Sequence, residues 1–331
     1  MPHQSSQSAK NMPMRYFIGV DLGGTNLKVG AVSTKGEVLF RTEAPSDVKG
    51  GRGALLKKIL NVIEETRHMV KGKRLSGIGL GVPGIVSPET GIIAQSPNLA
   101  GWVDFNIKDV LAEKLSWPLY VENDANAFAL GEGWTGAAVG IKNFCCLTLG
   151  TGVGGGIVLN GSLWHGVDGF AGEIGHIVVE PDGVPCNCGS QGCLERYVSA
   201  NGLVRMAQEG KDDILAAPLL KGCCGVDGLS AKAIADFARQ GDPFCAGLFQ
   251  KLARYLGIGL ADIVNLLNIE MIVVGGGLSN ASDLFLSAAR EEMLKRSFKV
   301  PGHRIKVVPA RLGDNGGIIG AAFIAFGKEL H

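Results

Sequence analysis

The stretch 15–32, RYFIGVDLGGTNLKVGAV, decides the fold of this chain. Two runs rich in β-branched and apolar residues flank a Gly-Gly turn, and that pattern is typical of a β-hairpin. Asp21 stands at the end of the first predicted strand. The stretch 143–160, NFCCLTLGTGVGGGIVLN, repeats the design. We therefore predict two duplicated lobes, each of which begins with a hairpin whose turn faces a shared cleft.

The segments between and after the hairpins predict an α/β protein, because strand and helix patterns alternate. The expected elements are helices at 55–70 and 107–115 and strands at 75–80, 119–122 and 272–274. Ser230 and Asp242 have the character of helix N-caps, and Pro243 suits the first turn of a long helix that reaches residue 267.

The composition excludes several classes of protein. The 331 residues are enough for two lobes, and 46% of them are hydrophobic. Lysine plus arginine (32) nearly balances aspartate plus glutamate (31), so no net charge attracts nucleic acid or a membrane. No run of about eighteen apolar residues predicts a transmembrane helix. Residues 1–13 do not resemble a secretory signal and are expected to form a disordered tail, so we expect a cytoplasmic protein.

The first hairpin turn combines groups that handle phosphate. Exposed amides in a glycine turn attract anions, and a carboxylate can hold Mg²⁺ through water. The residues concerned are Asp21, Gly23, Gly24, Thr25, Asn26 and Lys28. The alternative is a tight turn with a solvated aspartate.

The second hairpin turn holds the matching residues Gly150, Thr151, Gly152 and Gly154. Both 150–155 and 79–84 satisfy the dinucleotide pattern G-x-G-x-x-G. The first continues into a strand rather than a helix, and the second contains Pro83, so neither has the context of a Rossmann fold. The P-loop pattern is absent as well.

An Asn-Asp pair, Asn123 and Asp124, stands where a predicted strand gives way to a helix. Catalytic side chains in open α/β sheets commonly lie at such a position. Asp124 could accept the proton of an attacking hydroxyl, and the amide of Asn123 could orient the same substrate. The alternative is a helix N-cap, which asparagine and aspartate fill routinely.

Four residues have the spacing of a metal knuckle, H-x₉-C-x-C-x₄-C: His176, Cys186, Cys188 and Cys193. A Cys₃His set can close a tetrahedral structural Zn²⁺ site. The remaining cysteines have no such grouping and are expected to be buried or incidental thiols; they are Cys145, Cys146, Cys223, Cys224 and Cys245.

Two carboxylates, Glu173 and Glu195, flank this knuckle in the sequence. A folded knuckle would hold both near one place, where they could accept hydrogen bonds from sugar hydroxyls; ordinary solvated glutamates are the alternative. Asn98 adds an amide in a predicted loop, whereas the nearby Trp102 is expected to pack.

Taken in order, the segments DLGGTNLK, SPNLAGW, VENDANA, LGTGVGGG, GEIGH, CNCGSQGCLE and VVGGGLS resemble the ROK family of repressors, open reading frames and sugar kinases. The resemblance runs from about residue 15 to 327 and is strongest to bacterial ATP-dependent glucokinases. It implies a two-lobed actin-like ATPase fold, related to ribonuclease H, with ATP and sugar in the cleft. The expected small lobe is 14–122 plus 315–331, and the large lobe, with the zinc knuckle, is 123–314.

The resemblance also implies roles for residues of this chain. Both glycine turns would surround the phosphates of Mg²⁺-ATP, and Gly276 and Gly277 would lie against the nucleoside. Asp124 would be the catalytic base for phosphorylation of glucose. The positions that match sugar contacts are Asn98, Asn123, Asp124, Glu173, His176 and Glu195. Family resemblance further suggests a homodimer or homotetramer.

Other functions are compatible with parts of the same sequence pattern. The acceptor could be N-acetylmannosamine or fructose, and polyphosphate could replace ATP as donor. A sugar-responsive transcriptional regulator that lacks its DNA-binding region is the main alternative from another class, because members of the same family bind DNA. Against it, barely fourteen residues precede the first strand, and no recognition-helix pattern fits that space. A non-catalytic sugar-binding module is opposed by the phosphate-handling segments and Asp124.

Overall fold

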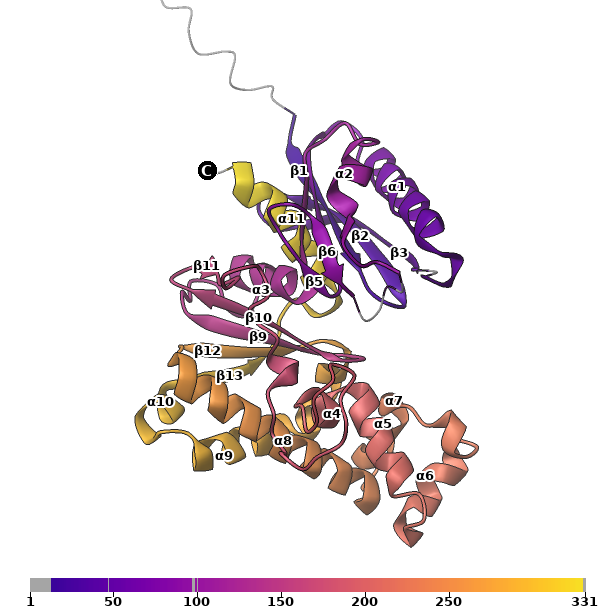
Figure 1. Cartoon of the computed structure of the whole chain (residues 1–331), viewed down its shortest axis with the longest axis vertical. Helices are drawn as coiled ribbons and strands as arrows, with labels where there is room; N and C mark the ends of the chain where they lie inside the picture. The colour runs from indigo at the N-terminus through magenta and orange to yellow at the C-terminus, as the bar shows by residue number, and fades with distance from the viewer. Residues whose placement is uncertain (1–12, 47, 97–98, 100, 330–331) are drawn as a thin grey trace, which may run out of the picture. The chain divides into compact units, whose positions relative to one another are not determined.

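Figure 1 shows a computed structural model of the chain, which describes residues 13–46, 48–96, 99 and 101–329. The chain divides into two compact units. Unit 1 comprises Met1–Trp134 and Asn315–His331, and unit 2 comprises Thr135–Asp314. Most of the tail expected at 1–13 lies outside the described residues.

Unit 1 is built on a five-stranded sheet with the order β3-β2-β1-β4-β8. The strands are β1 (Arg15–Leu22), β2 (Asn26–Ser33), β3 (Val38–Pro45), β4 (Arg74–Val82) and β8 (Leu119–Asn123). The predicted hairpin is confirmed, because β1 pairs antiparallel with β2. Strands β1, β4 and β8 run parallel to one another, so their carboxyl ends meet at one edge of the sheet.

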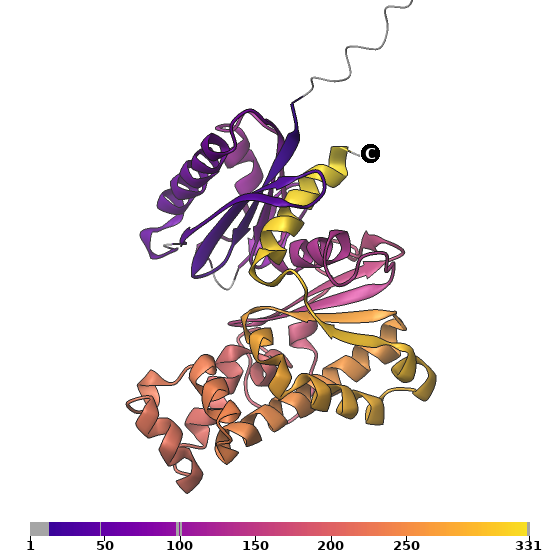
Figure 2. The same cartoon turned by 180° about the vertical axis from the view of Figure 1, so that it is seen from behind.

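Helices cover both faces of this sheet (Figures 1 and 2). They are α1 (Arg52–Met69), α2 (Ile107–Ala112), α3 (Asp124–Trp134) and α11 (Gly316–Glu329). The face of α1 that carries Leu55, Ile59 and Ile63 is buried, as its amphipathic pattern predicts. The helix predicted at 107–115 ends at Ala112, because the chain tightens there into turns. A small sheet of β5 (Ile85–Val86), β6 (Ile92–Gln95) and β7 (Phe105–Asn106) completes the strands of the unit.

Helix α11 lies unusually close to the sheet because the strands beneath it carry glycine. A Cβ built on Gly19 would overlap the carbonyl oxygen of Ile318, and one built on Gly79 would overlap that of Ala321. Helix α3 approaches α11 in the same manner through Gly131. These glycines are therefore needed for close packing.

Unit 2 repeats the strand order of unit 1, as β11-β10-β9-β12-β13. Its strands are β9 (Phe144–Leu149), β10 (Val153–Leu159), β11 (Ser162–Leu163), β12 (Met271–Gly275) and β13 (Lys306–Pro309). The second predicted hairpin is formed by β9 and β10, and β12 adds parallel to β9 as β4 adds to β1. The duplication predicted from the two hairpins is thus present in the topology.

The other elements of unit 2 are mostly helical. The α-helices are α4 (Glu195–Val198), α5 (Ala200–Glu209), α6 (Ala217–Gly222), α7 (Ala231–Arg239), α8 (Pro243–Leu267), α9 (Leu286–Arg296) and α10 (Lys299–Arg304). Both predicted N-caps are confirmed: Ser230 Oγ accepts from Ala233 N at 3.1 Å, and Asp242 Oδ1 accepts from Cys245 N at 2.9 Å. Long α8 packs its apolar face into the core of this unit.

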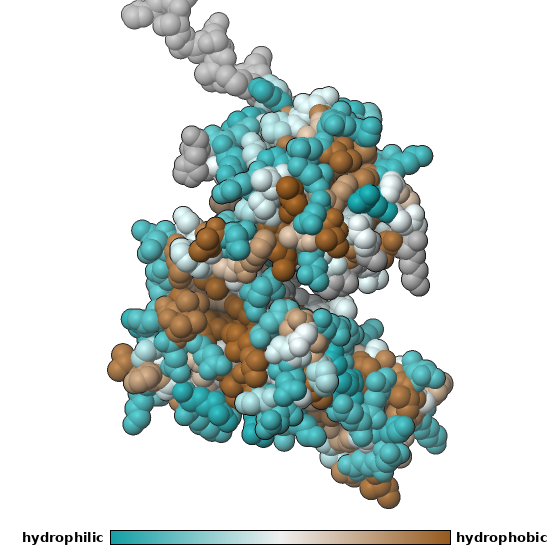
Figure 3. All heavy atoms as spheres, viewed as in Figure 1, coloured by the Kyte–Doolittle hydropathy of each residue, from teal (hydrophilic) through white to brown (hydrophobic). Residues whose placement is uncertain are grey.

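Within the described residues, no helix is long and apolar enough to cross a membrane. Figure 3 shows that the hydrophobic residues on the viewed face lie in separate patches among hydrophilic ones.

Candidate active site and metal knuckle

The β1–β2 turn of unit 1 has a fixed conformation. Gly23 N donates to Asn26 O at 2.9 Å across the turn. Ser46, at the end of β3, holds the turn from outside: its backbone N donates to Thr25 O at 2.8 Å, and its hydroxyl donates to Gly24 O at 2.9 Å. The predicted phosphate-handling turn is therefore a preorganised loop.

Side chains on the two strands extend this turn. Asp21 and Lys28 are direct cross-strand partners in the register of β1 and β2, so their side chains leave the same face of the hairpin. The Asn26 amide donates to Glu43 Oε1 at 2.8 Å. That hydrogen bond ties the Asn26 side chain to β3.

Asp21 also lies against the start of α11, a feature that the sequence analysis missed. A Cβ built on Gly317 would stand 3.1 Å from Asp21 Cβ and would overlap its carboxylate. Any larger residue at 317 would displace the carboxylate. The signal in the sequence is the Gly316-Gly317 pair that opens an apolar helical run.

Asn123 and Asp124 have different local roles. Asn123 Oδ1 accepts from Ala125 N at 2.9 Å and from Asn126 N at 3.0 Å, so Asn123 fills the N-cap position of α3. Its Nδ2 donates to Gly84 O at 3.0 Å. The alternative of a helix N-cap thus describes Asn123 well. A sugar contact by this residue would have to use the second N–H of its amide.

Asp124 is the first residue of α3 and stands at the carboxyl end of the parallel strands. A Cβ on Gly81 would lie 3.5 Å from Asp124 Cα, which places Asp124 beside the end of β4. The register aligns Asp21 with Gly81 and Gly81 with Glu122. Unit 1 therefore brings Asp21, on β1, and Asp124, directly after β8, to one edge of the sheet. Strands β1 and β8 are roughly 10 Å apart, and ligands of open α/β sheets bind at this edge.

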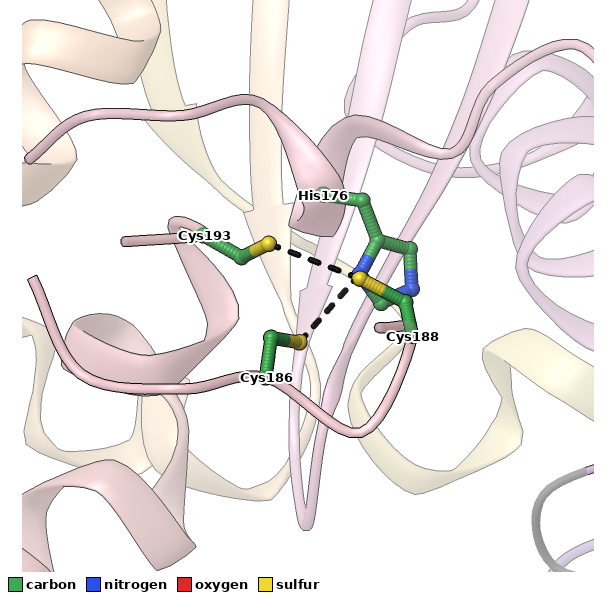
Figure 4. A group of neighbouring side chains, drawn as sticks. All are labelled: His176, Cys186, Cys188 and Cys193. Carbon is green, nitrogen blue, oxygen red and sulfur yellow. Dashed lines mark hydrogen bonds between the residues drawn. The ribbon is translucent and has the colours of Figure 1, made fainter. Parts of the chain in front are cut away.

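The four predicted metal ligands of unit 2 come together (Figure 4). The possible ligand atoms of His176, Cys186, Cys188 and Cys193 all lie within 4.8 Å of one another. Cys188 Sγ lies 3.6 Å from Cys193 Sγ, and Cys186 Sγ lies 3.7 Å from His176 Nδ1. Zn–S bonds of about 2.3 Å at tetrahedral angles put two sulfur atoms about 3.8 Å apart, so the spacing suits a zinc tetrahedron.

The backbone of the knuckle is held by its own hydrogen bonds. Gly192 N donates to Val184 O at 2.9 Å, and Cys186 N donates to Ser190 O at 2.8 Å. The hydroxyl of Tyr197 accepts from Val184 N at 3.1 Å and so fixes the knuckle to α4. Gly192, with φ of 69°, occupies the left-handed region that glycine tolerates.

Two thiols of the knuckle have pKa values that are shifted in opposite directions. Burial raises the pKa of Cys193 to about 12, which keeps this thiol neutral near pH 7 when no cation is bound. A hydrogen bond with the backbone at Ser190 lowers the pKa of Cys188. Metal binding needs thiolates, and a divalent cation supplies the positive charge that would stabilise them.

The two carboxylates that flank the knuckle lie close to it. Glu173 Oε2 is 3.8 Å from His176 Nε2, the ring nitrogen that does not face Cys186. Burial raises the pKa of Glu173, nearby His176 lowers it, and the charge of Glu195 raises it further. Unit 2 thus brings Glu173, His176 and Glu195 into one neighbourhood.

Glu195 joins this neighbourhood to the second glycine turn. Its Oε2 accepts from Val153 N, the first residue of β10, at 2.8 Å. A Cβ built on Gly152 would overlap the Glu195 carboxylate, so glycine is required there for the carboxylate to reach the turn. Sequence reasoning identified both residues but not the hydrogen bond between their segments.

The remaining predicted nucleotide residues of unit 2 cluster at the carboxyl ends of β9 and β12. Gly150 N donates to Gly152 O at 2.9 Å, which tightens the turn around Thr151. Gly276 has φ of 85°, and a Cβ on it would stand 2.5 Å from Leu149 O. Gly277 follows at the start of η6 (Gly277–Leu284), and Gly154 lies in β10 opposite Thr148.

Asn98 lies outside the described residues. Trp102 packs as expected: it is 2% exposed, and its ring meets Phe105 edge-on at 5.2 Å.

Comparison with known proteins places this arrangement in a family. The profile of the ROK family matches residues 17–328. The chain belongs to the ROK family. The α/β architecture expected from the alternating strand and helix patterns is accordingly confirmed as the ROK sugar kinase fold.

Individual known proteins resemble the chain over almost its whole length. A protein named glucokinase from Halalkalibacterium halodurans is 40% identical over 325 residues, which cover 96% of this chain and 97% of that protein. The crystal structure of a ROK family glucokinase from Streptomyces griseus in complex with glucose and AMPPNP matches with a TM-score of 0.84 and 36% identity, covering 94% of this chain and 99% of the other. A xylose repressor from Caldicellulosiruptor bescii is 31% identical, covering 97% of this chain and 80% of the repressor.

Proposed function

We propose that this protein is an ATP-dependent glucokinase, which transfers the γ-phosphoryl group of ATP to glucose and forms glucose 6-phosphate and ADP. The observation that carries the proposal is the nearly full-length similarity to glucokinases, one of which was crystallised with glucose and AMPPNP. The positions of Asp21 and Asp124 within unit 1, and of the two carboxylates beside the knuckle in unit 2, support it.

In this proposal Asp124 of unit 1 orients the primary hydroxyl of glucose and accepts its proton. Phosphoryl transfer depends mainly on in-line positioning and on charge stabilisation, so a late proton acceptor fixed at a helix start suits the reaction. Asp21 would hold Mg²⁺ through water, and the ion would neutralise charge that develops on the transferred group. Lys28 and the backbone amides of the preorganised turn would bind the phosphate groups of ATP.

Unit 2 would supply the sugar specificity and the remaining nucleotide contacts. Glu173 and Glu195 are hydrogen-bond acceptors for vicinal hydroxyls, and His176 Nε2 faces the same neighbourhood. The Gly150–Gly154 segment would line the phosphates, and Gly276 and Gly277 the nucleoside. Because Val153 N donates a hydrogen bond to Glu195, movement of the sugar-binding carboxylate would shift the backbone of the phosphate turn.

The knuckle would hold Zn²⁺ through His176 Nδ1 and three thiolates. Four protein ligands leave no open coordination position, so the ion would stabilise the knuckle without joining the reaction. The second ring nitrogen of His176 would stay available to Glu173 and the sugar.

Substitution of Asp124 tests the proposed base. Asp124→Ala should lower kcat for glucose phosphorylation by about 10²–10⁴-fold, the usual contribution of a general base, while glucose still binds. A coupled assay for ADP gives the rate, and calorimetry gives the glucose affinity. Asp109→Ala, which removes a carboxylate from α2 of the same unit, is the control. Retention of more than about a tenth of wild-type turnover would contradict the proposed role.

A panel of acceptors tests the substrate. Glucose should give the highest kcat/KM, ahead of N-acetylmannosamine and fructose, with ATP as donor. If no hexose stimulates ADP release, the protein is a sugar-binding module or regulator rather than a kinase.

We further propose that the protein acts in the cytoplasm as a homodimer or homotetramer, with units 1 and 2 as the two lobes of the enzyme. Light scattering on the full-length protein would test the assembly, and a monomer at micromolar concentration would contradict it.

A further inference from the structure

A hollow of about 760 Å³ lies at the end of unit 1 where β1 and β4 begin. Its walls come from the end of α1, the start of β4, the segment before β8 and the end of α11; the residues used below are Tyr16, Arg67, Lys71, Lys73, Arg74 and Trp117. The volume falls in the range of about 300–1,000 Å³ that is typical of small-molecule sites. We call it the basic hollow.

The basic hollow is far from the proposed active site. Tyr16 and Asp21 lie on the same strand, with five residues of rise between them, which is roughly 17 Å. The phosphate turn and Asp124 stand at the carboxyl ends of the parallel strands, whereas the hollow is at their amino ends. A ligand here would therefore not occupy the site of ATP or glucose.

The side chains that line the hollow carry a net positive charge. Among the residues that the structure describes, Lys71, Lys73 and Arg74 form no ion pair. Arg67 differs, because its Nε donates to Glu64 Oε2 at 2.8 Å and its guanidinium lies 5.5 Å from the centre of the Trp117 ring. The carboxylate of Glu329 is already paired with Arg15 at 2.7 Å.

The C-terminal ends of two helices oppose the binding of an anion here, but their combined charge is smaller than that of the cations. Helices α1 and α11 end at the hollow, and each C-terminus carries a partial charge of about −0.5. The three unpaired cations exceed this combined charge of about −1. The chain's own residues 1–13 contain Lys10 and no aspartate or glutamate, so they do not complement the charge.

The hollow also offers an apolar wall. Trp117 is half-buried and Pro118 is exposed, and both line the hollow, whereas Tyr16, Val70 and Leu75, which also border it, are buried. Lysine and arginine suit phosphate oxygens, and an indole face suits a planar or apolar group. This pairing of cations with an aromatic wall defines the class of ligand.

We propose that the basic hollow binds a small organic phosphate, with its phosphate on Lys71, Lys73 and Arg74 and its apolar part against Trp117. The site is separate from the catalytic one, and its occupancy does not depend on the glucokinase activity proposed above.

Calorimetry with 2-naphthyl phosphate tests this site on the full-length protein. Saturating glucose and AMPPNP are present throughout, so that the proposed catalytic site is occupied. Lys71→Gln/Lys73→Gln removes two cations from the hollow. Lys57→Gln/Lys58→Gln removes the same charge from α1 outside the hollow and serves as the matched control. Circular dichroism and hexose phosphorylation confirm that each variant is folded.

We expect one molecule of 2-naphthyl phosphate per chain, with affinity at least tenfold weaker in the Lys71/Lys73 variant and unchanged in the control. Trp117→Leu should weaken 2-naphthyl phosphate but leave inorganic phosphate unaffected, and uncharged 2-naphthol should not bind. Absence of binding to the wild type at millimolar probe overturns the proposal. Equal weakening in both double variants also overturns it, because it would show a general charge effect.

Discussion

The close approach of α3 to α11 gives a sharp test of how unit 1 holds its proposed base. A Cβ on Gly131 would stand 2.6 Å from Gly316 O, 3.0 Å from Gly320 N and 3.2 Å from Gly320 Cα. Ordinary contacts of a Cβ begin at 3.4 Å, so Gly131→Ala would require the α11 backbone to move by several tenths of an ångström. All three neighbours are backbone atoms of a buried helix, which cannot rotate away as a side chain could.

The net effect follows from two opposing contributions. Overpacking of this kind costs about 1–3 kcal/mol, and the crowding by three backbone atoms places Gly131→Ala near the upper end. Replacement of glycine by alanine in a helix returns about 1 kcal/mol. We expect a loss of about 2 kcal/mol in the free energy of unfolding of unit 1, or roughly 4–8 °C in Tm for a domain of this size.

Gly327→Ala is the matched control, because Gly327 lies on α11 but its Cβ would meet only a Phe323 ring carbon at 3.9 Å. Here the helix propensity acts alone, and Tm should rise by up to about 4 °C. Scanning calorimetry measures both variants. Because Asp124 begins the helix that carries Gly131, Gly131→Ala should also lower kcat. If Gly131→Ala leaves Tm within 1 °C of wild type, or shifts it upward like the control, the packing argument is refuted.

Three further substitutions address unit 2. Cys188→Ser should abolish stoichiometric zinc and lower Tm and glucose affinity together; metal analysis that finds no zinc in the wild type would remove the basis for this expectation. Glu195→Gln keeps an acceptor for Val153 N but loses its charge, so glucose KM should rise at least tenfold with a Tm change under 2 °C; an unchanged KM would exclude Glu195 from sugar binding. Asp242→Ala removes the N-cap of α8 and should cost about 1 kcal/mol, seen as a Tm lower by roughly 2–4 °C; Asp242→Asn should retain most of that stability.

Local patterns carried most of what the sequence predicted correctly. The two hairpins were visible because their apolar strands and glycine turns are contiguous. The caps Ser230 and Asp242 were visible because an N-cap bonds a backbone amide only a few residues away. The cysteine knuckle was visible for the same reason, since its four candidate ligands are close in the sequence and a short loop can bring their side chains together.

Local sequence rules were not sufficient to assign the role of Asn123. Its residue type is compatible with both a helix cap and a substrate contact, and sequence position could not separate the two. The structure decides that its side-chain oxygen caps α3 and that its amide donates to Gly84 O, which lies in the connection between β4 and β5.

By itself the sequence determined the α/β class, the duplicated hairpins and the group of four candidate metal ligands, since each depends on neighbours along the chain. Only the tertiary structure decided the contacts between distant segments. Gly317 lies against Asp21 across almost the whole length of the chain, and Glu195 bonds the amide of Val153. The basic hollow places Lys71, Lys73 and Arg74, where α1 connects to β4, in one cavity with Trp117 and the end of α11. Such contacts depend on which strands pair and how closely helices pack on them, and no pattern of nearby residues encodes that geometry.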